Sequence, residues 1–165
     1  MAVLSWGKPR LFIKKTDETG AKWMELPTPV EDSTQLSTTK GDKKEAKVEG
    51  GENEDVKFGK NTYALAFNLR QVKGRNRPIV DEDGVITENY AIALQPEDAS
   101  NEGFMIDKAT VSVEDSWTSA DGGIWAYTFD ALKPGTGKQV KWGTVVAEGT
   151  GSSLTVTFTE TNDED

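Results

Sequence analysis

The strand signal of this chain is strongest in Tyr63-Ala64-Leu65-Ala66-Phe67-Asn68-Leu69-Arg70, residues 63–70. Large apolar side chains occupy every second position, and small or polar side chains occupy the positions between them. Successive side chains of a strand point to opposite faces, so this alternation predicts a strand with one face in a hydrophobic core. The same period recurs at Ile92 and Leu94, at Val111 and Val113, at Trp125, Tyr127 and Phe129, at Val140 and Trp142, and at Leu154, Val156 and Phe158.

Turn-forming residues separate these runs, and two shorter strands are expected at Leu11-Phe12-Ile13 and Trp23-Met24, joined by a turn over residues 16–20. The turn signals are Asp83-Gly84, Asn101-Glu102-Gly103, Asp121-Gly122-Gly123, Pro134-Gly135-Thr136-Gly137 and Gly149-Thr150-Gly151. This spacing predicts one all-β domain over residues 1–165, an antiparallel β-sandwich or pseudo-barrel. We expect at most one short helix, between Pro78 and Glu82, and an acidic tail over residues 160–165.

The composition excludes several classes of function. The 165 residues include 28 acidic and 19 basic side chains, which gives a net charge of -9. That charge argues against nucleic-acid binding through a basic surface and against docking on anionic lipid. The chain has no cysteine and no histidine, so disulfides, zinc–thiolate sites and Ser-His-Asp catalysis are excluded. We expect no enzyme activity and no metal or other cofactor.

The sequence also predicts where the protein is made. Its first ten residues contain no apolar run that suits a signal peptide, and the two basic residues follow the short apolar stretch. No segment approaches the roughly 20 apolar residues that a membrane helix needs. We therefore expect synthesis in the cytoplasm and no membrane partner.

Residues 37–60 form a long polar segment that does not suit the interior of a sheet. The segment centres on Gly50-Gly51, which suits a tight hairpin turn, with arms of about 10 residues or roughly 33 Å. A disordered polar loop is the open alternative. If the segment is ordered, its strands need partners, and a second copy of the chain could supply them. The expected assembly interface consists of Lys40, Asp42, Lys43, Lys44, Glu45, Lys47, Glu49, Gly50, Gly51, Glu52, Glu54, Asp55 and Lys57.

The long polar ribbon between Leu36 and Asn61, followed by the apolar strand 63–69 in an all-β chain of this size, resembles phage tail tube proteins and the tube proteins of contractile injection systems. The resemblance implies hexameric rings that stack into a hollow tube, with other tail proteins as partners and the virion tail as the location. It also implies passive passage of DNA or an effector. Such a lumen should not hold phosphate. Seven acids could contribute to it: Asp81, Glu82, Asp83, Glu88, Glu97, Asp98 and Glu102.

Other interpretations of single motifs remain open at this point. A monomeric immunoglobulin-like or carbohydrate-binding sandwich is the alternative function, with tryptophans as a sugar-stacking platform. The tryptophans are Trp6, Trp23, Trp117, Trp125 and Trp142. Asp81-Glu82-Asp83-Gly84 could bind Ca²⁺, but it lacks the spaced ligands of an EF-hand, so a plain turn is the favoured interpretation.

Overall fold

A computed structural model of the chain describes residues 7–16 and 20–161. Within these residues the chain forms strands joined by turns and loops, and every strand pair is antiparallel. The strands are β1 (Arg10–Lys15), β2 (Met24–Glu25), β3 (Gln35–Thr39), β4 (Lys43–Lys47), β5 (Asn53–Phe58), β6 (Thr62–Arg70), β7 (Val85–Gln95), β8 (Gly103–Thr118), β9 (Gly122–Ala131), β10 (Val140–Glu148) and β11 (Thr155–Glu160). The prediction of an antiparallel all-β fold is confirmed.

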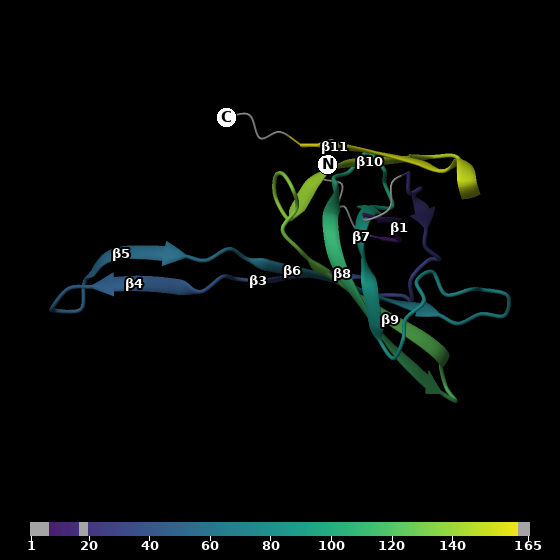
Figure 1. Ribbon diagram of the computed structural model, residues 1–165, viewed down its shortest axis with the longest axis horizontal. Coiled ribbons are helices and arrows are strands. Elements are labelled where there is room, and N and C mark those ends of the chain that lie inside the picture. Colours follow the sequence, from purple (N-terminus) through teal and green to yellow (C-terminus); the bar gives the residue numbers. More distant parts are fainter. Residues whose placement is uncertain (1–6, 17–19, 162–165) are drawn as a thin grey trace.

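The topology depends on β8, which is 16 residues long and changes partner along one edge. Residues 103–106 of β8 pair with β10, whereas residues 109–118 pair with β9. The other edge of β8 pairs with β7. The main sheet runs in the order β2-β1-β7-β8-β9-β6-β3, and the β10–β11 hairpin branches from β8 and lies across the top of the body in Figure 1.

The main hydrophobic core contains the strand with the strongest alternation. On β6, Leu65, Phe67 and Leu69 are buried, as the period predicts. The ring of Phe67 lies 5.9 Å from that of Tyr127 and 5.6 Å from that of Phe129, both on β9. Aromatic pairs at these separations add to the free energy gained from apolar burial. The main core therefore fixes the β6–β9 pair. This pair anchors the chain segment that leaves the body between β3 and β6.

A second, smaller core lies on the opposite face of β1 and β7. Phe12 and Ala93 pack there against Val145 of β10 and Leu154, which immediately precedes β11. In β1, the neighbours Leu11 and Ile13 belong to the main core. Since both faces of β1 are buried, its three consecutive residues can all be apolar. The β10–β11 hairpin is thus a second layer, which gives the fold its sandwich-like form.

The structure corrects the expected helix. Residues 78–82 are not helical, and the only helical turn among the described residues is a 3-10 turn at Gly151–Ser153. One tertiary contact and one local turn explain the difference: the Tyr127 hydroxyl donates to the Ile79 carbonyl at 2.8 Å, and the Gly84 N–H donates to the Asp81 carboxylate three residues earlier at 2.6 Å. These bonds hold the segment as a loop that enters β7 through a tight turn.

Smaller expectations need adjustment as well. The second short strand lies one residue later than predicted, at Met24–Glu25. Glu160 closes β11 instead of starting a free tail. Parts of the expected 16–20 turn and of the acidic tail, and also Trp6, lie outside the described residues.

Candidate assembly site

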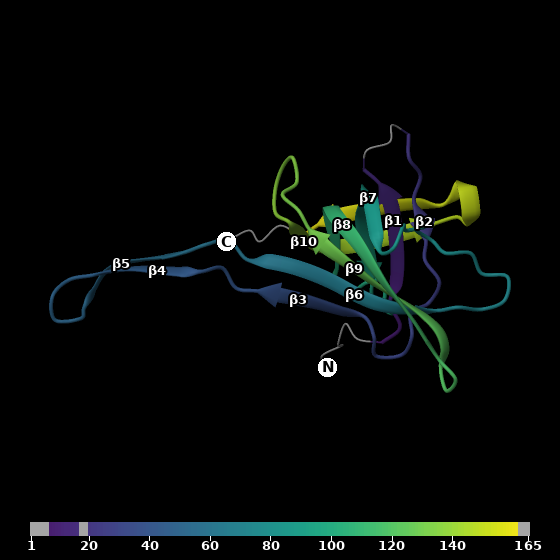
Figure 2. The ribbon, with the colours of Figure 1, turned by 60° about the horizontal axis from the view of Figure 1, so that its bottom comes forward.

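The expected assembly interface forms a two-stranded ribbon, β4–β5, that projects from the body. It continues the β3–β6 hairpin: Thr39 pairs with Thr62, and Lys43 pairs with Phe58. Three residues intervene on each arm, so the pairing keeps one register from the body into the ribbon. Figure 2 shows β4 and β5 leaving the body as a single arm. The structure thus describes this segment as a hairpin.

The two glycines of the neck between the paired regions allow a close approach of the arms. The Gly59 N–H donates to the Asp42 carbonyl at 2.8 Å, and the Gly41 N–H donates to Oδ1 of Asn61 at 3.1 Å. A Cβ built on Gly41 would lie 2.1 Å from the Gly59 carbonyl oxygen, which no real side chain tolerates. Glycine at position 41 is therefore required for this neck geometry.

The tip of the ribbon lies at Gly50 and Gly51, as predicted. Both glycines have positive φ, 96° and 86°, a region that residues with a Cβ rarely adopt. The Val48 N–H donates to the Glu52 carbonyl at 2.9 Å and closes the turn. A bulge follows, because Ala46 pairs with Asp55 whereas Lys47 pairs with Asn53. Glu54 is the extra residue of this bulge.

Every residue of β4 and β5 is exposed, and among the described residues each strand pairs only with the other. Both outer edges of the ribbon therefore have no strand partner. Antiparallel ladders alternate inward and outward N–H groups, and the Gly59–Asp42 bond sets the phase. The N–H groups of Glu45 and Val56 accordingly point outward, and that of Val56 donates to the carboxylate of Asp55 at 2.9 Å. Such an edge is a template for adding a further strand.

The charges of the ribbon are not paired across its two strands. Lys44 lies directly opposite Lys57, a like-charge pair. The ion pairs of the ribbon run along β4 instead, from Glu45 to Lys43 at 2.5 Å and to Lys47 at 3.5 Å. Opposite charges on facing strands stabilise pairing and like charges oppose it. The pairing within the ribbon is therefore not the arrangement that its charges favour.

The charges are also segregated along the ribbon. The tip, residues 49–55, carries four acids and no base: Glu49, Glu52, Glu54 and Asp55. The stem, residues 40–48 and 56–60, carries six lysines with two acids, Asp42 and Glu45. Lys40 lies with its ammonium 4.6 Å from the ring centre of Phe58, an exposed aromatic of the stem. The ribbon is thus basic near the body and acidic at its end.

No protein-family model and no curated protein matches this chain. No helix among the described residues is long and apolar enough to cross a membrane. Nor does any group of three or more carboxylates within those residues have the geometry of a metal site. Asp81, the first acid of the possible Ca²⁺ motif, instead accepts from Gly84 and pairs with Arg77 at 3.2 Å.

The seven acids between residues 81 and 102 do not gather on one surface. Asp81, Glu82 and Asp83 precede β7, Glu88 lies within it, and the other three follow it, so the two ends of an 11-residue strand separate them. Several serve local structure: Glu88 pairs with Lys15 at 3.1 Å, and Asp98 accepts from Ser100 at 2.7 Å. The hydrogen bonds from Ser100 lower the pKa of the Asp98 carboxyl.

The tryptophans of the described residues have different surroundings. Trp125 is buried in the main core, Trp23 packs against the second core, and the ring of Trp142 lies 5.2 Å from that of Phe104. Trp117, 72% exposed, lies at the end of β8. These four side chains come from separate elements and do not form one platform, although Trp117 and Trp125 line a shared groove.

One charged surface was missed from the sequence: residues 70–77 carry Arg70, Lys73, Arg75 and Arg77 without an acid. Arg77 pairs with Asp115 at 2.8 Å and lies 4.9 Å from the ring centre of Trp125. The hydrogen bond to Asp115 raises the pKa of Arg77. The run of cations can be seen in the sequence, but the sequence does not show where it lies in the fold.

Proposed function

We propose that this chain is a structural subunit that assembles with its own copies through the β4–β5 ribbon, in the manner of a phage tail tube protein. Stacked rings, six-membered by the resemblance, would form a hollow tube for passage of DNA or an effector, together with other tail proteins. Such a subunit is made in the cytoplasm of a bacterial host and resides in the virion tail. It acts through assembly geometry and needs no catalytic residue or cofactor.

The observation that carries this proposal is the projecting ribbon with two open edges. A two-stranded ribbon without a hydrophobic face is marginally stable in water on its own. Here every residue of both strands is exposed, and none packs on the body of its own chain. Added strands from sister molecules would satisfy the outward backbone groups and bury part of Val56 and Phe58, which are 36% and 55% exposed.

Removing the ribbon is the direct test. Replacing residues 40–61 by Asn-Gly joins Thr39 to Thr62, which already face each other, through a two-residue hairpin turn. The body should keep its fold by circular dichroism, and assembly into rings or tubes should be lost in electron micrographs of the concentrated protein. Normal tube formation by this variant would refute the proposal.

Proline substitutions test whether strands are added at the ribbon edges. Glu45→Pro and Val56→Pro each remove one outward N–H while leaving the bonds between β4 and β5 in place. Val56→Pro also removes the bond to the Asp55 carboxylate, so Glu45→Pro is the cleaner of the two tests. Glu45→Ala and Val56→Ala are the matched controls, because they remove the same side chains but keep the N–H. We expect at least one proline variant to weaken assembly more than its alanine control. Equal assembly in both pairs would exclude strand addition at these two positions.

A further inference from the structure

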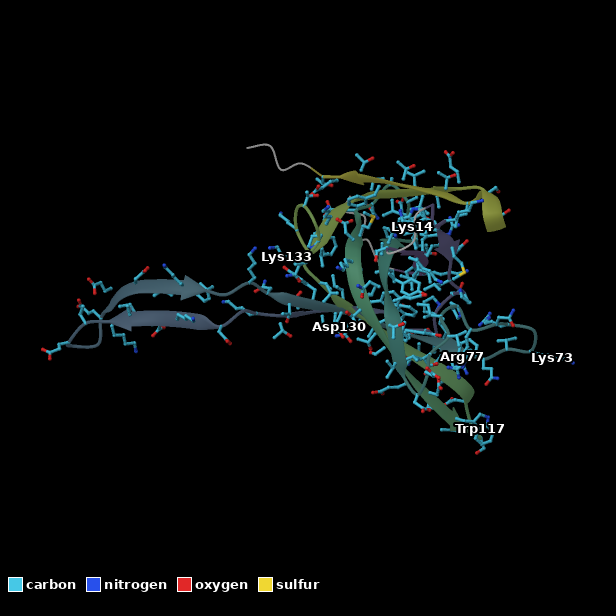
Figure 3. All side chains as sticks on the ribbon, viewed as in Figure 1. Lys14, Lys73, Arg77, Trp117, Asp130 and Lys133 are labelled. Atoms are coloured by element: carbon cyan, nitrogen blue, oxygen red, sulfur yellow. The ribbon has the colours of Figure 1, made fainter. Side chains whose placement is uncertain are left out.

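The acidic tip of the ribbon and the cations of residues 70–77 lie at opposite ends of the molecule. In Figures 1 and 2 the ribbon extends to one end of the longest axis, and the loop after β6 extends to the other. Figure 3 places Lys73 at the far end of this loop from the ribbon. Turning the molecule about its long axis does not change this order. A single chain therefore does not bring its own two ends together.

The loop end forms a receptive surface, which we call the basic loop face: Arg70, Lys73, Arg75 and Trp117. Among the described residues, none of the three cations has a carboxylate partner; Arg70 donates to the Asp121 carbonyl at 3.1 Å and Arg75 to the Arg70 carbonyl at 2.9 Å. Trp117 borders a groove between β8–β9 and the loop.

The groove is held open by local contacts that fix its two walls. Gln71 at the start of the loop donates its backbone N–H to the Gly123 carbonyl of β9 at 2.9 Å. A Cβ built on Gly123 would lie 2.3 Å from Oε1 of Gln71, so a larger residue there would displace this side chain. On the other wall, Arg77 is anchored by Asp115. Both ends of the loop are therefore fixed to the body, and the loop between them carries the cations that have no carboxylate partner.

The ribbon tip has the complementary chemistry. Glu49, Glu52, Glu54 and Asp55 have no ion-pair partner within the described part of the chain. Val48, 44% exposed, adds an apolar side chain beside them. The distance from the neck to the tip is about 30 Å at strand rise. A body of this size has a radius of gyration of about 15 Å, so the ribbon reaches across much of a neighbour.

We propose that the ribbon tip of one copy docks on the basic loop face of the next, so that the copies associate head to tail. This inference rests on the proposed function, because it names the surface that receives the ribbon. A contact between two different patches leaves one of each patch free on a pair, and it therefore continues to a ring or a filament. The unpaired acids of one copy then meet the unpaired cations of another.

A second arrangement would also match charges: two ribbons side by side in opposite directions, each acidic tip against the other's basic stem. That contact is symmetric and closes at two copies. In such a dimer the basic loop face makes no contact, and the two ends of the dimer are equivalent. The head-to-tail contact is favoured because it pairs both charged ends and can propagate.

Cross-linking distinguishes the two arrangements, because the chain has no cysteine of its own. Glu52→Cys protein is mixed with affinity-tagged Lys73→Cys protein and treated with a short bis-maleimide. Lys133→Cys, an exposed lysine elsewhere on the body, replaces Lys73→Cys in the control. We expect the mixed dimer to exceed the control by about tenfold, as local docking raises the effective concentration. A predominance of dimers between two Glu52→Cys chains would overturn the proposal in favour of ribbon–ribbon pairing.

Charge exchange tests the same contact through assembly. Lys73→Glu with Arg75→Glu should raise the concentration needed for assembly by about tenfold, since two attractive pairs become repulsive. Adding Glu52→Lys and Glu54→Lys restores the parent's net charge and should restore assembly. Lys133→Glu with Lys138→Glu, two exposed cations with the same change in charge, should assemble as the parent does.

The outcomes separate this inference from the proposed function. If removal of the ribbon abolishes assembly while the Lys73 and Arg75 reversals have no effect, the ribbon docks elsewhere and this inference alone fails. If removal of the ribbon leaves assembly intact, both fail. Rescue by the combined four-residue variant, with assembly that weakens as salt rises, supports both.

Discussion

Tyr127 connects the main core to the loop that carries the basic loop face, and Tyr127→Phe tests that connection. The side chain is 1% exposed, and its hydroxyl donates to the Ile79 carbonyl at 2.8 Å. Ile79 is itself buried, at 3% exposed. Phenylalanine keeps the ring in the core but leaves a buried carbonyl without its donor. Such a loss costs about 1–3 kcal/mol.

The cost can be converted into a melting temperature. For a chain of this length, 1 kcal/mol lowers Tm by about 2–4 °C, so Tyr127→Phe should lower it by roughly 2–12 °C. Thermal unfolding followed by circular dichroism measures this shift. Amide hydrogen exchange should show the largest loss of protection in residues 72–80, because the bond holds this loop against the core. Ile92→Val, a change of apolar volume in the same core, serves as a control that leaves the Tyr127 bond in place.

The pH dependence gives an independent check on Tyr127. Burial raises the pKa of the Tyr127 hydroxyl above its usual value near 10. The unfolded chain then ionises at lower pH than the folded chain. This contribution to stability is fully present below pH of about 10 and declines as the pH rises through the folded pKa. Tyr127→Phe removes that decline. An unchanged Tm together with an unchanged alkaline profile would refute the role assigned to this hydroxyl.

Three further predictions follow from single contacts. Gly41→Ala should leave the free energy of unfolding of the body within about 0.5 kcal/mol of the parent, because the neck is outside the cores, yet weaken assembly in electron micrographs. Lys57→Glu replaces the like-charge pair with Lys44 by an opposite pair; it should stabilise the ribbon by about 0.2–1 kcal/mol, seen as slower amide exchange that returns to the parent value at high salt. The hydrogen bond from Arg10 lowers the pKa of Glu25, so the stability that this pair contributes is present above pH of about 4.5 and is lost as the pH falls through the folded value. Glu25→Gln should flatten the acid slope of Tm, and an unaltered slope would contradict this.

The sequence predicted those elements whose burial differs between their two faces. The alternation in β6 and β9 follows directly from one face packing in the main core. The run Leu11-Phe12-Ile13 has no alternation because β1 lies between two cores, and only its apolar character marked it as a strand. The change of partner along β8 coincides with a break in its apolar period, because the buried positions change parity between Ile106 and Ala109, where the pairing with β7 also shifts register. The sequence prediction rested on Val111 and Val113 alone and did not detect this break.

The expected helix failed for a related reason. Pro78 suits the first turn of a helix, but local preference of this kind is worth less than a buried tertiary hydrogen bond. The Tyr127–Ile79 bond joins residues that no short window of sequence compares, whereas the Asp81–Gly84 bond spans three residues and belongs to the turn that Asp83-Gly84 signals. The ribbon was predictable because its signal is local: a polar hairpin with a Gly-Gly tip. The basic loop was not recognised as a possible binding surface, because that interpretation depends on its position at the opposite end of the molecule from the tip.

The ribbon resolves a difficulty that the net charge raises. Chains with a charge of -9 repel one another at long range, so association needs attraction that acts locally. At physiological ionic strength the screening length is about 8 Å. A tip carried about 30 Å from its own body therefore responds mainly to the charges it touches on a neighbour. The acids of the tip and the cations of the loop lie at opposite ends of the molecule. Each group can therefore meet the other only on another copy. Short-range complementarity of this kind would allow acidic chains to associate in spite of their net charge.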